Sequence, residues 1–109
     1  MAYDEKLAGR IRTALGKRKG LQEKQMFGGI AFLLNGNMCV GVHQNELMVR
    51  LAADETDKAL AQRHTKLFDL TGRPMKGWIL VQPAGLATAA QLGKWVKVAA
   101  MYAGSLPKK

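Results

Sequence analysis

Cysteine and histidine are scarce in this sequence of 109 residues, and each shortage excludes a class of site. The single cysteine, Cys39, excludes an intrachain disulfide and any zinc site built from several cysteines. The two histidines, His43 and His64, do not form an HExxH motif, so the sequence predicts neither a metal ion nor a cofactor. An unpaired thiol is typical of the reducing cytoplasm, where we expect this chain to work.

Long apolar runs and glycine-rich nucleotide motifs are also missing. The longest uninterrupted apolar run covers residues 30–34, whereas a membrane-spanning helix needs about 20 apolar residues. Residues 1–6 lack the apolar segment of a signal peptide. Neither GxxxxGK[ST] nor GxGxxG occurs, which argues against a phosphate-binding loop. We therefore expect a soluble protein with no membrane partner.

Acidic residues number only eight, and most have a structural role as helix-start or turn residues: Asp4, Glu5, Glu46, Asp54, Glu55 and Asp57. Only Glu23 and Asp69 remain as a pair that could serve acid–base chemistry. Cys39 and His43 lie four residues apart on one predicted strand, about 13 Å, which is too far for the imidazole to activate the thiol. We predict no catalytic residue and a protein that is not an enzyme.

Apolar spacing predicts three helices. Leu7, Ile11 and Leu15 recur every four residues, as expected for one buried helix face. The predicted helices cover residues 4–18, 53–64 and 88–102, with N-terminal caps at Asp4, Asp54 and Thr88. The last helix has an apolar face made of Leu92, Trp95, Val96, Ala99 and Tyr102.

Short apolar runs between turn residues predict the strands. Asn35-Gly36 is typical of a type I′ hairpin turn, which needs positive φ at both central residues. Gln44-Asn45 predicts a second tight turn, and whether residues 24–27 add a further strand stays open. The predicted strands are residues 30–34, 38–43, 47–51, 67–70 and 76–82.

These elements indicate one α+β domain over residues 1–109, a common length for a single domain. Runs of strands are followed by helices and do not alternate strictly with them, which favours an antiparallel sheet. We expect two layers: an antiparallel sheet of about five strands with helices packed on one face, in the order α-β-β-β-α-β(-β)-α.

The face of the sheet away from the helices is expected to carry some apolar side chains. Four residues have the opposite parity to Phe32, Val40, Val49 and Leu80: Leu33, Cys39, Met48 and Ile79. Scattered apolar surface residues are normal, and this is one interpretation. The other is a face formed by Leu33, Met48 and Ile79 that binds a protein partner or a second copy of the chain.

Basic residues are in excess: 17 Lys and Arg against eight acids give a formal net charge of +9. This balance favours polyanionic partners, so nucleic acid is a possible ligand. No helix-turn-helix, zinc finger or aromatic RNA-binding motif is present, and a solvated basic face is the simpler alternative. The candidate phosphate contacts are Arg10, Lys17, Arg18, Lys19, Lys24, Arg73 and Lys76.

Two sequence segments resemble a known family. The first runs from Met26-Phe27-Gly28-Gly29 through Asn35-Gly36 to Leu47-x-Val49-Arg50-Leu51, and the second is Gly72-Arg73-Pro74-Met75-x-Gly77-Trp78. With the tryptophan-containing terminal helix, they resemble the N-terminal domain of the TfoX/Sxy family over essentially the whole chain. The resemblance implies an α+β fold and a regulatory role in DNA-uptake competence, exerted together with a transcription regulator, without catalytic residues.

Overall fold

The computed structural model describes residues 3–26, 29–68 and 77–107. Its helices are α1 (Glu5–Leu15), α2 (Thr56–Leu60) and α3 (Ala89–Ser105), with two 3₁₀ segments, η1 (Ala53–Glu55) and η2 (Pro83–Leu86). Its strands are β1 (Leu21–Met26), β2 (Gly29–Leu34), β3 (Asn37–His43), β4 (Glu46–Arg50), β5 (Thr65–Leu67) and β6 (Trp78–Val81).

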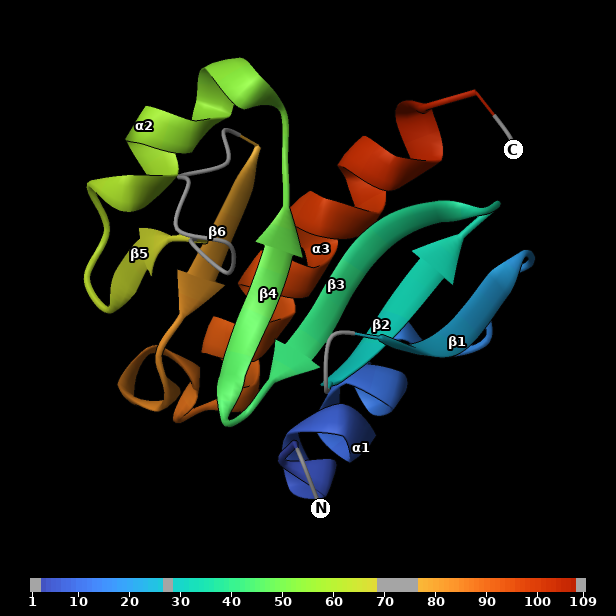
Figure 1. Cartoon of the computed structure of the whole chain (residues 1–109), viewed down its shortest axis with the longest axis horizontal. Helices are drawn as coiled ribbons and strands as arrows, with labels where there is room; N and C mark the ends of the chain where they lie inside the picture. The colour runs from blue at the N-terminus through green and yellow to red at the C-terminus, as the bar shows by residue number, and fades with distance from the viewer. Residues whose placement is uncertain (1–2, 27–28, 69–76, 108–109) are drawn as a thin grey trace.

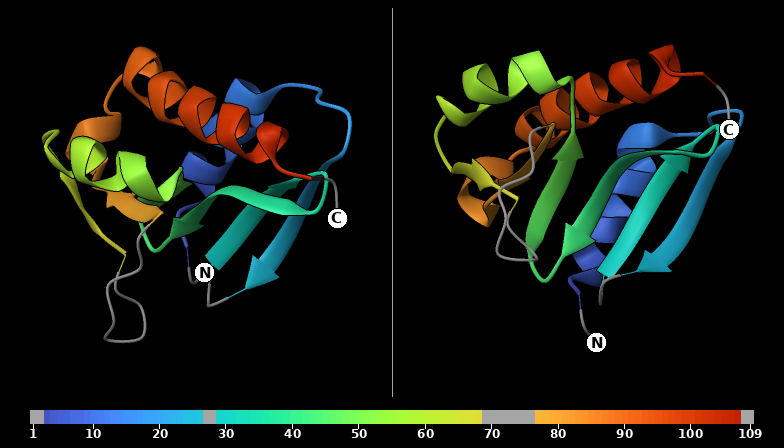
Figure 2. Two further views of the ribbon diagram at one scale, coloured as in Figure 1. Left: turned by 90° about the horizontal axis from the view of Figure 1, so that it is seen from above. Right: turned by 45° about the horizontal axis from the view of Figure 1, so that its top comes forward.

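The six strands form one antiparallel sheet in the order β1-β2-β3-β4-β6-β5 (Figure 1). All three helices lie on the same side of it, with α3 packed on β2, β3 and β4 (Figure 2). The predicted fold class is therefore confirmed, with six strands in place of about five. The additional strand is β1, which occupies the region that the sequence left open.

Local signals placed the turns and most helix starts correctly. Asn35 and Gly36 have φ of 55° and 84°, as the predicted type I′ turn requires. Asp4 caps α1 by accepting hydrogen bonds from the Lys6 and Leu7 N–H groups. Thr88 caps α3 in a reciprocal capping box with Gln91.

The second predicted helix is shorter than expected. Asp54 makes no capping hydrogen bond, because the chain enters this region through η1, and α2 ends at Leu60. His64 has φ of 66°, a left-handed conformation that a helix cannot contain. β5 begins directly after it, so the predicted extension of this helix to residue 64 and its cap at Asp54 are wrong.

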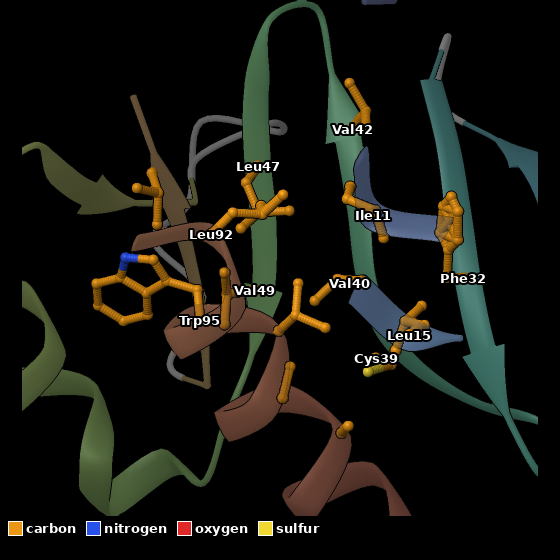
Figure 3. Packing of buried hydrophobic residues seen from close by; sticks show 14 of the residues in the cluster. Ile11, Leu15, Phe32, Cys39, Val40, Val42, Leu47, Val49, Leu92 and Trp95 are labelled. Carbon is orange, nitrogen blue, oxygen red and sulfur yellow. The ribbon is translucent and has the colours of Figure 1, made fainter. Parts of the chain in front are cut away.

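The main core lies between the sheet and the helices. Leu7, Ile11 and Leu15 of α1 are buried in it, as their spacing predicted. Figure 3 shows Ile11 and Leu15 among the core side chains. Phe32 is the largest side chain that is fully buried, and Trp95 of α3 closes the core toward α2. Among the described helices, none combines the length and the apolar character needed to cross a membrane.

Two parity assignments were wrong, for different physical reasons. A bulge between Phe32 and Leu33 shifts the register of β3 by one residue, so that Cys39 joins Val40 in the helix-covered core (Figure 3). Ile79 pairs with Val49 and shares its face, so it also lies in the main core. Its neighbour Leu80 therefore points to the opposite side of the sheet.

A smaller apolar cluster lies apart from the main core, on the face of the sheet away from the helices. It contains Met48, Phe68 and Leu80, with Trp78 packed against it. Met48 and Leu80 are cross-strand partners, and the rings of Phe68 and Trp78 are tilted at 50° with centroids 5.9 Å apart. This part of the open face is therefore covered by its own side chains.

Candidate protein-binding site

Five of the seven predicted phosphate contacts lie in the part of the chain that the structure describes. Lys17 and Lys19 are exposed in the loop after α1, and Lys24 is exposed on β1, at one edge of the sheet. Arg73 and Lys76 fall outside the residues that the structure describes. All five described cations are exposed, and Lys17, Lys19 and Lys24 come from two different segments.

The other two described cations, Arg10 and Arg18, have structural partners. The Arg10 guanidinium donates to the carbonyl oxygens of Leu86 and Thr88, at 2.6 and 3.3 Å, and so ties α1 to the start of α3. The Arg18 Nε donates to the carbonyl oxygen of Leu15 at 2.9 Å and closes the end of α1. Both guanidinium groups therefore make contacts within the fold. Arg10 joins α1 to the start of α3, and Arg18 closes the end of α1.

The predicted partner face on the sheet does not exist as one surface. Ile79 is fully buried in the main core, and Met48 is 2% exposed in the smaller cluster. Leu33 alone remains half-buried on the open side. The prediction is wrong for Met48 and Ile79, because it did not anticipate the pairing of Ile79 with Val49 or the packing of Phe68 and Leu80 around Met48.

Exposed apolar side chains occur instead on the outer side of α3. Within the described part of the chain, Val98 and Met101 are the large hydrophobic residues that remain exposed, at 41% and 68%. They lie off the buried stripe of α3, which the sequence placed correctly at Leu92, Trp95 and Ala99. The signal that could have revealed them was the presence of apolar residues at helix positions outside the predicted buried face.

A groove between α2 and α3 lies beside Val98. Its volume is about 320 Å³, and most of its lining is apolar, with Leu51, Ala59 and Trp95 deep inside and Val98 and Tyr102 along α3. The polar side chains along it belong to α2 and the segments on either side of it: Glu55, Lys58 and Gln62.

Two polar contacts fix α2 in place. The Thr56 hydroxyl oxygen accepts a hydrogen bond of 2.8 Å from the Gly77 N–H, which anchors α2 to the chain entering β6. Thr56 is 1% exposed, so this hydrogen bond is shielded from water. After the end of α2, Gln62 accepts a hydrogen bond from the ammonium group of Lys94 on α3. The wall of the groove is thus attached both to the sheet and to α3.

Stacked cations mark both ends of the groove. At one end the Lys94 ammonium lies 4.7 Å from the centroid of the Trp95 ring. At the other end the Arg50 guanidinium lies over the rings of Tyr102 and Trp78, at 5.7 and 5.8 Å. The floor of the groove, formed by Leu51, Ala59 and Trp95, is part of the packed core. The sequence did not indicate the role of Arg50, since its two ring partners come from separate elements.

A second hollow, of about 280 Å³, brings ionisable groups together on the other side of the molecule. His43, Glu46 and Lys66 line it, with Phe68 and Leu80 as its apolar wall. The Lys66 ammonium lies 3.0 Å from a Glu46 carboxylate oxygen, so the two charges neutralise each other. No hydroxyl or thiol lines it among the described residues, and their acids, histidines and cysteine form no group of three that could hold a metal. We interpret this hollow as a surface depression beside a structural ion pair between Glu46 of β4 and Lys66 of β5.

The thiol of Cys39 is buried, and burial raises its pKa from its ordinary value of 9.0 to about 11. Between these values the unfolded thiol loses its proton while the folded one keeps it. The free energy of unfolding should therefore fall as pH rises from 9 to 11, by at most about 1.4 kcal/mol per pH unit. Urea unfolding at pH 8, 9 and 10 should show this decrease, and Cys39→Ala should lack it. Equal slopes for the two proteins would contradict the assignment.

Residues 13–103 match the family described as the TfoX N-terminal domain. The chain belongs to this family. No curated protein and no solved structure matches the chain. The matched range includes α2, nearly all of α3 and every residue that lines the groove between them, so the groove lies within the TfoX N-terminal domain itself.

Proposed function

We propose that this TfoX N-terminal domain is a non-enzymatic interaction module that binds a protein partner through the α2–α3 groove. Its membership of the family supports a role in transcriptional or competence regulation in the cytoplasm. The observation that carries the proposal is the apolar groove with Val98 exposed in its lining and Met101 exposed three residues farther along α3. Large apolar side chains that remain exposed next to a groove are typical of a binding surface.

The residues of the groove suit protein recognition. Tyr102 is half-buried and offers part of its aromatic ring along the groove, and aromatic residues contribute much of the binding energy at protein interfaces. The floor of the groove is formed by side chains of the core, among them Trp95 at 4% exposed, so little of their side-chain entropy is lost when a partner binds. A partner side chain that enters the groove would replace water over an apolar surface.

Removing the exposed apolar side chains should weaken binding without unfolding the domain. In Val98→Asn/Met101→Gln both substituted side chains are solvent-exposed, so we expect a melting temperature close to wild type. Helical peptides selected by display on the wild-type domain should bind this variant about tenfold to hundredfold more weakly, at about 1 kcal/mol for each lost contact. Calorimetric titration measures the change.

Leu33→Gln is the matched control, since Leu33 is half-buried on the opposite side of the sheet. It should leave peptide affinity unchanged. The proposal fails if the Val98/Met101 variant binds the selected peptides as tightly as wild type, or if only Leu33→Gln weakens them.

Nucleic-acid binding is the second candidate function. It is favoured by the exposed Lys17 and Lys19 in a loop that is held to the β2–β3 turn by a hydrogen bond of 3.0 Å between the Asn35 N–H and the Gly20 carbonyl. Contacts of this kind would bind phosphates without reading sequence, and affinity would fall steeply with salt. Fluorescence anisotropy with duplex DNA at two salt concentrations tests it, and absence of binding at low salt would exclude it.

A further inference from the structure

The segment that leads from α1 into β1 carries an excess of positive charge. Between residues 10 and 24 the sequence has six Lys and Arg and a single acid, Glu23. The carboxylate of Glu23 is already paired with Arg12, whose guanidinium donates two hydrogen bonds of 2.8 Å to it. Four further exposed cations follow α1, and we call them the basic edge: Lys17, Arg18, Lys19 and Lys24.

The other described acids lie away from the basic edge. Asp4 and Glu5 are at the opposite end of α1, about 15 Å away at about 1.5 Å per residue. Three exposed acids belong to η1 and α2, on the far side of the molecule from β1 (Figure 2): Asp54, Glu55 and Asp57. Glu46 is paired with Lys66. In the described part of the chain, therefore, no carboxylate forms an ion pair with the basic edge.

Backbone hydrogen bonds hold the loop that carries three of the four cations. The Leu21 N–H donates to the carbonyl oxygen of Arg18 at 3.2 Å, within the turn that opens β1. The Asn35 N–H donates to the carbonyl oxygen of Gly20 at 3.0 Å, so the loop lies against the β2–β3 turn. Because the backbone is held at these points, binding a ligand would order mainly the long basic side chains.

The basic edge offers charge without apolar or aromatic anchors. From residue 16 to residue 25 the one large apolar side chain is that of Leu21, which is half-buried. Protein interfaces take much of their binding energy from aromatic anchors, and an interfacial helix needs an apolar face to enter a membrane. Single-stranded nucleic acid is bound largely by stacking of its bases on aromatic rings. The described residues of this surface suit none of these ligands.

Binding by charge alone favours the polymer with the highest density of phosphates. A duplex carries one charge per about 1.7 Å of its axis, and each neutralised phosphate contributes a salt slope of about −0.9, against about −0.7 for a single strand. The chain from Lys19 to Lys24 spans at most about 17 Å, which corresponds to about five phosphates along one strand. The four cations can therefore reach the backbone of one duplex.

We infer that the basic edge binds the phosphate backbone of duplex nucleic acid without reading its base sequence. The inference rests on the second candidate function and adds to it the form of the nucleic acid and the residues in contact. Arg18 contributes less than the lysines, because its Nε already donates to the carbonyl oxygen of Leu15. Since the site contacts phosphates only, duplex DNA and duplex RNA should both bind.

The test is fluorescence anisotropy with a labelled duplex of about 20 base pairs, between about 50 and 200 mM salt. A plot of log association constant against log salt concentration should have a slope of about −3 to −4 for the wild-type domain. Lys17→Gln/Lys19→Gln should reduce the magnitude of this slope by about 2 and weaken binding at low salt about tenfold to hundredfold. Lys24→Gln should reduce it by about 1.

Lys58→Gln/Lys97→Gln is the matched control, because it removes the same charge from exposed lysines on α2 and α3. It should leave the salt slope unchanged. A single strand of the same length should bind the wild-type domain more weakly than the duplex does. Thermal unfolding of each variant verifies that the fold is intact.

The outcomes separate this inference from the proposed functions. Tighter binding of the single strand, or equal losses in the control and in Lys17→Gln/Lys19→Gln, would overturn the inference and leave nucleic-acid binding as a candidate. Absence of duplex binding at low salt would overturn both, and so would binding to phosphatidylserine vesicles in place of duplexes. None of these results affects peptide binding at the α2–α3 groove, which Val98→Asn/Met101→Gln tests separately.

Discussion

Gly29→Ala is expected to destabilise the domain by about 3 kcal/mol or more, a large part of the roughly 5–15 kcal/mol that holds a small domain folded. A Cβ on Gly29 would lie much closer to the Val42 carbonyl oxygen than the sum of the two van der Waals radii allows. That oxygen belongs to β3, which is paired with β2 on one side and β4 on the other, so its backbone cannot move without breaking strand pairing. We expect the melting temperature to fall by about 10 °C or more.

The same substitution in α3, Gly93→Ala, is expected to have the opposite effect on stability. Gly93 is inside α3, and a Cβ there would meet no atom within 4 Å. Alanine has the higher helix propensity, so we expect this variant to gain about 0.5–1 kcal/mol. Thermal and urea unfolding of both variants measure the contrast. Equal stability of Gly29→Ala and wild type would show that the backbones of β2 and β3 are farther apart than described.

The close approach at Gly29 illustrates which parts of the fold the sequence could predict. Contacts between near neighbours were predictable: Asp4 and Thr88 cap their helices, and Asn35-Gly36 turns the chain, because each acts within a few residues of itself. The glycine pair at residues 28–29 does not by itself reveal this contact. The Val42 carbonyl that requires glycine at position 29 comes from the next strand.

Side-chain direction in the sheet was predictable only where the register was regular. The bulge beside Phe32 places Cys39 and Val40 on one face, although they are adjacent in the chain. The parity of Ile79 relative to the other strands is set by its pairing with Val49, 30 residues earlier in the sequence. Alternation within a strand fixes which residues share a face, and pairing with another strand decides which face that is.

The candidate site could not be predicted from the sequence, for a related reason. Its walls come from α2 and α3, so that Lys58 and Trp95 line one groove although they are far apart in the chain. The composition shows an excess of basic residues. It cannot show that Arg10 joins two helices whereas Lys97 faces solvent. Only the packing of the helices distinguishes cations that build the fold from cations that are available to a partner.

Met48→Lys is expected to destabilise the domain strongly, whereas Met101→Lys is not. Met48 is 2% exposed and packs with Phe68 and Leu80, so a lysine there would place an ammonium group in an apolar cluster without a partner. We expect a loss of about 3 kcal/mol or more. Met101 is 68% exposed, and the same substitution there should change the free energy of unfolding by less than about 0.5 kcal/mol.

The pH dependence distinguishes a buried charge from a general packing defect at Met48. Burial disfavours the charged ammonium and lowers the pKa of the new lysine in the folded state below its unfolded value of about 10.4. The folded variant then binds fewer protons than the unfolded one, so its stability relative to Met101→Lys should rise between pH 7 and pH 10. Urea unfolding of both variants at pH 7, 8.5 and 10 measures this difference. A constant difference across that range would mean that the new ammonium reaches water, and that the smaller cluster leaves the open face of the sheet accessible to a partner after all.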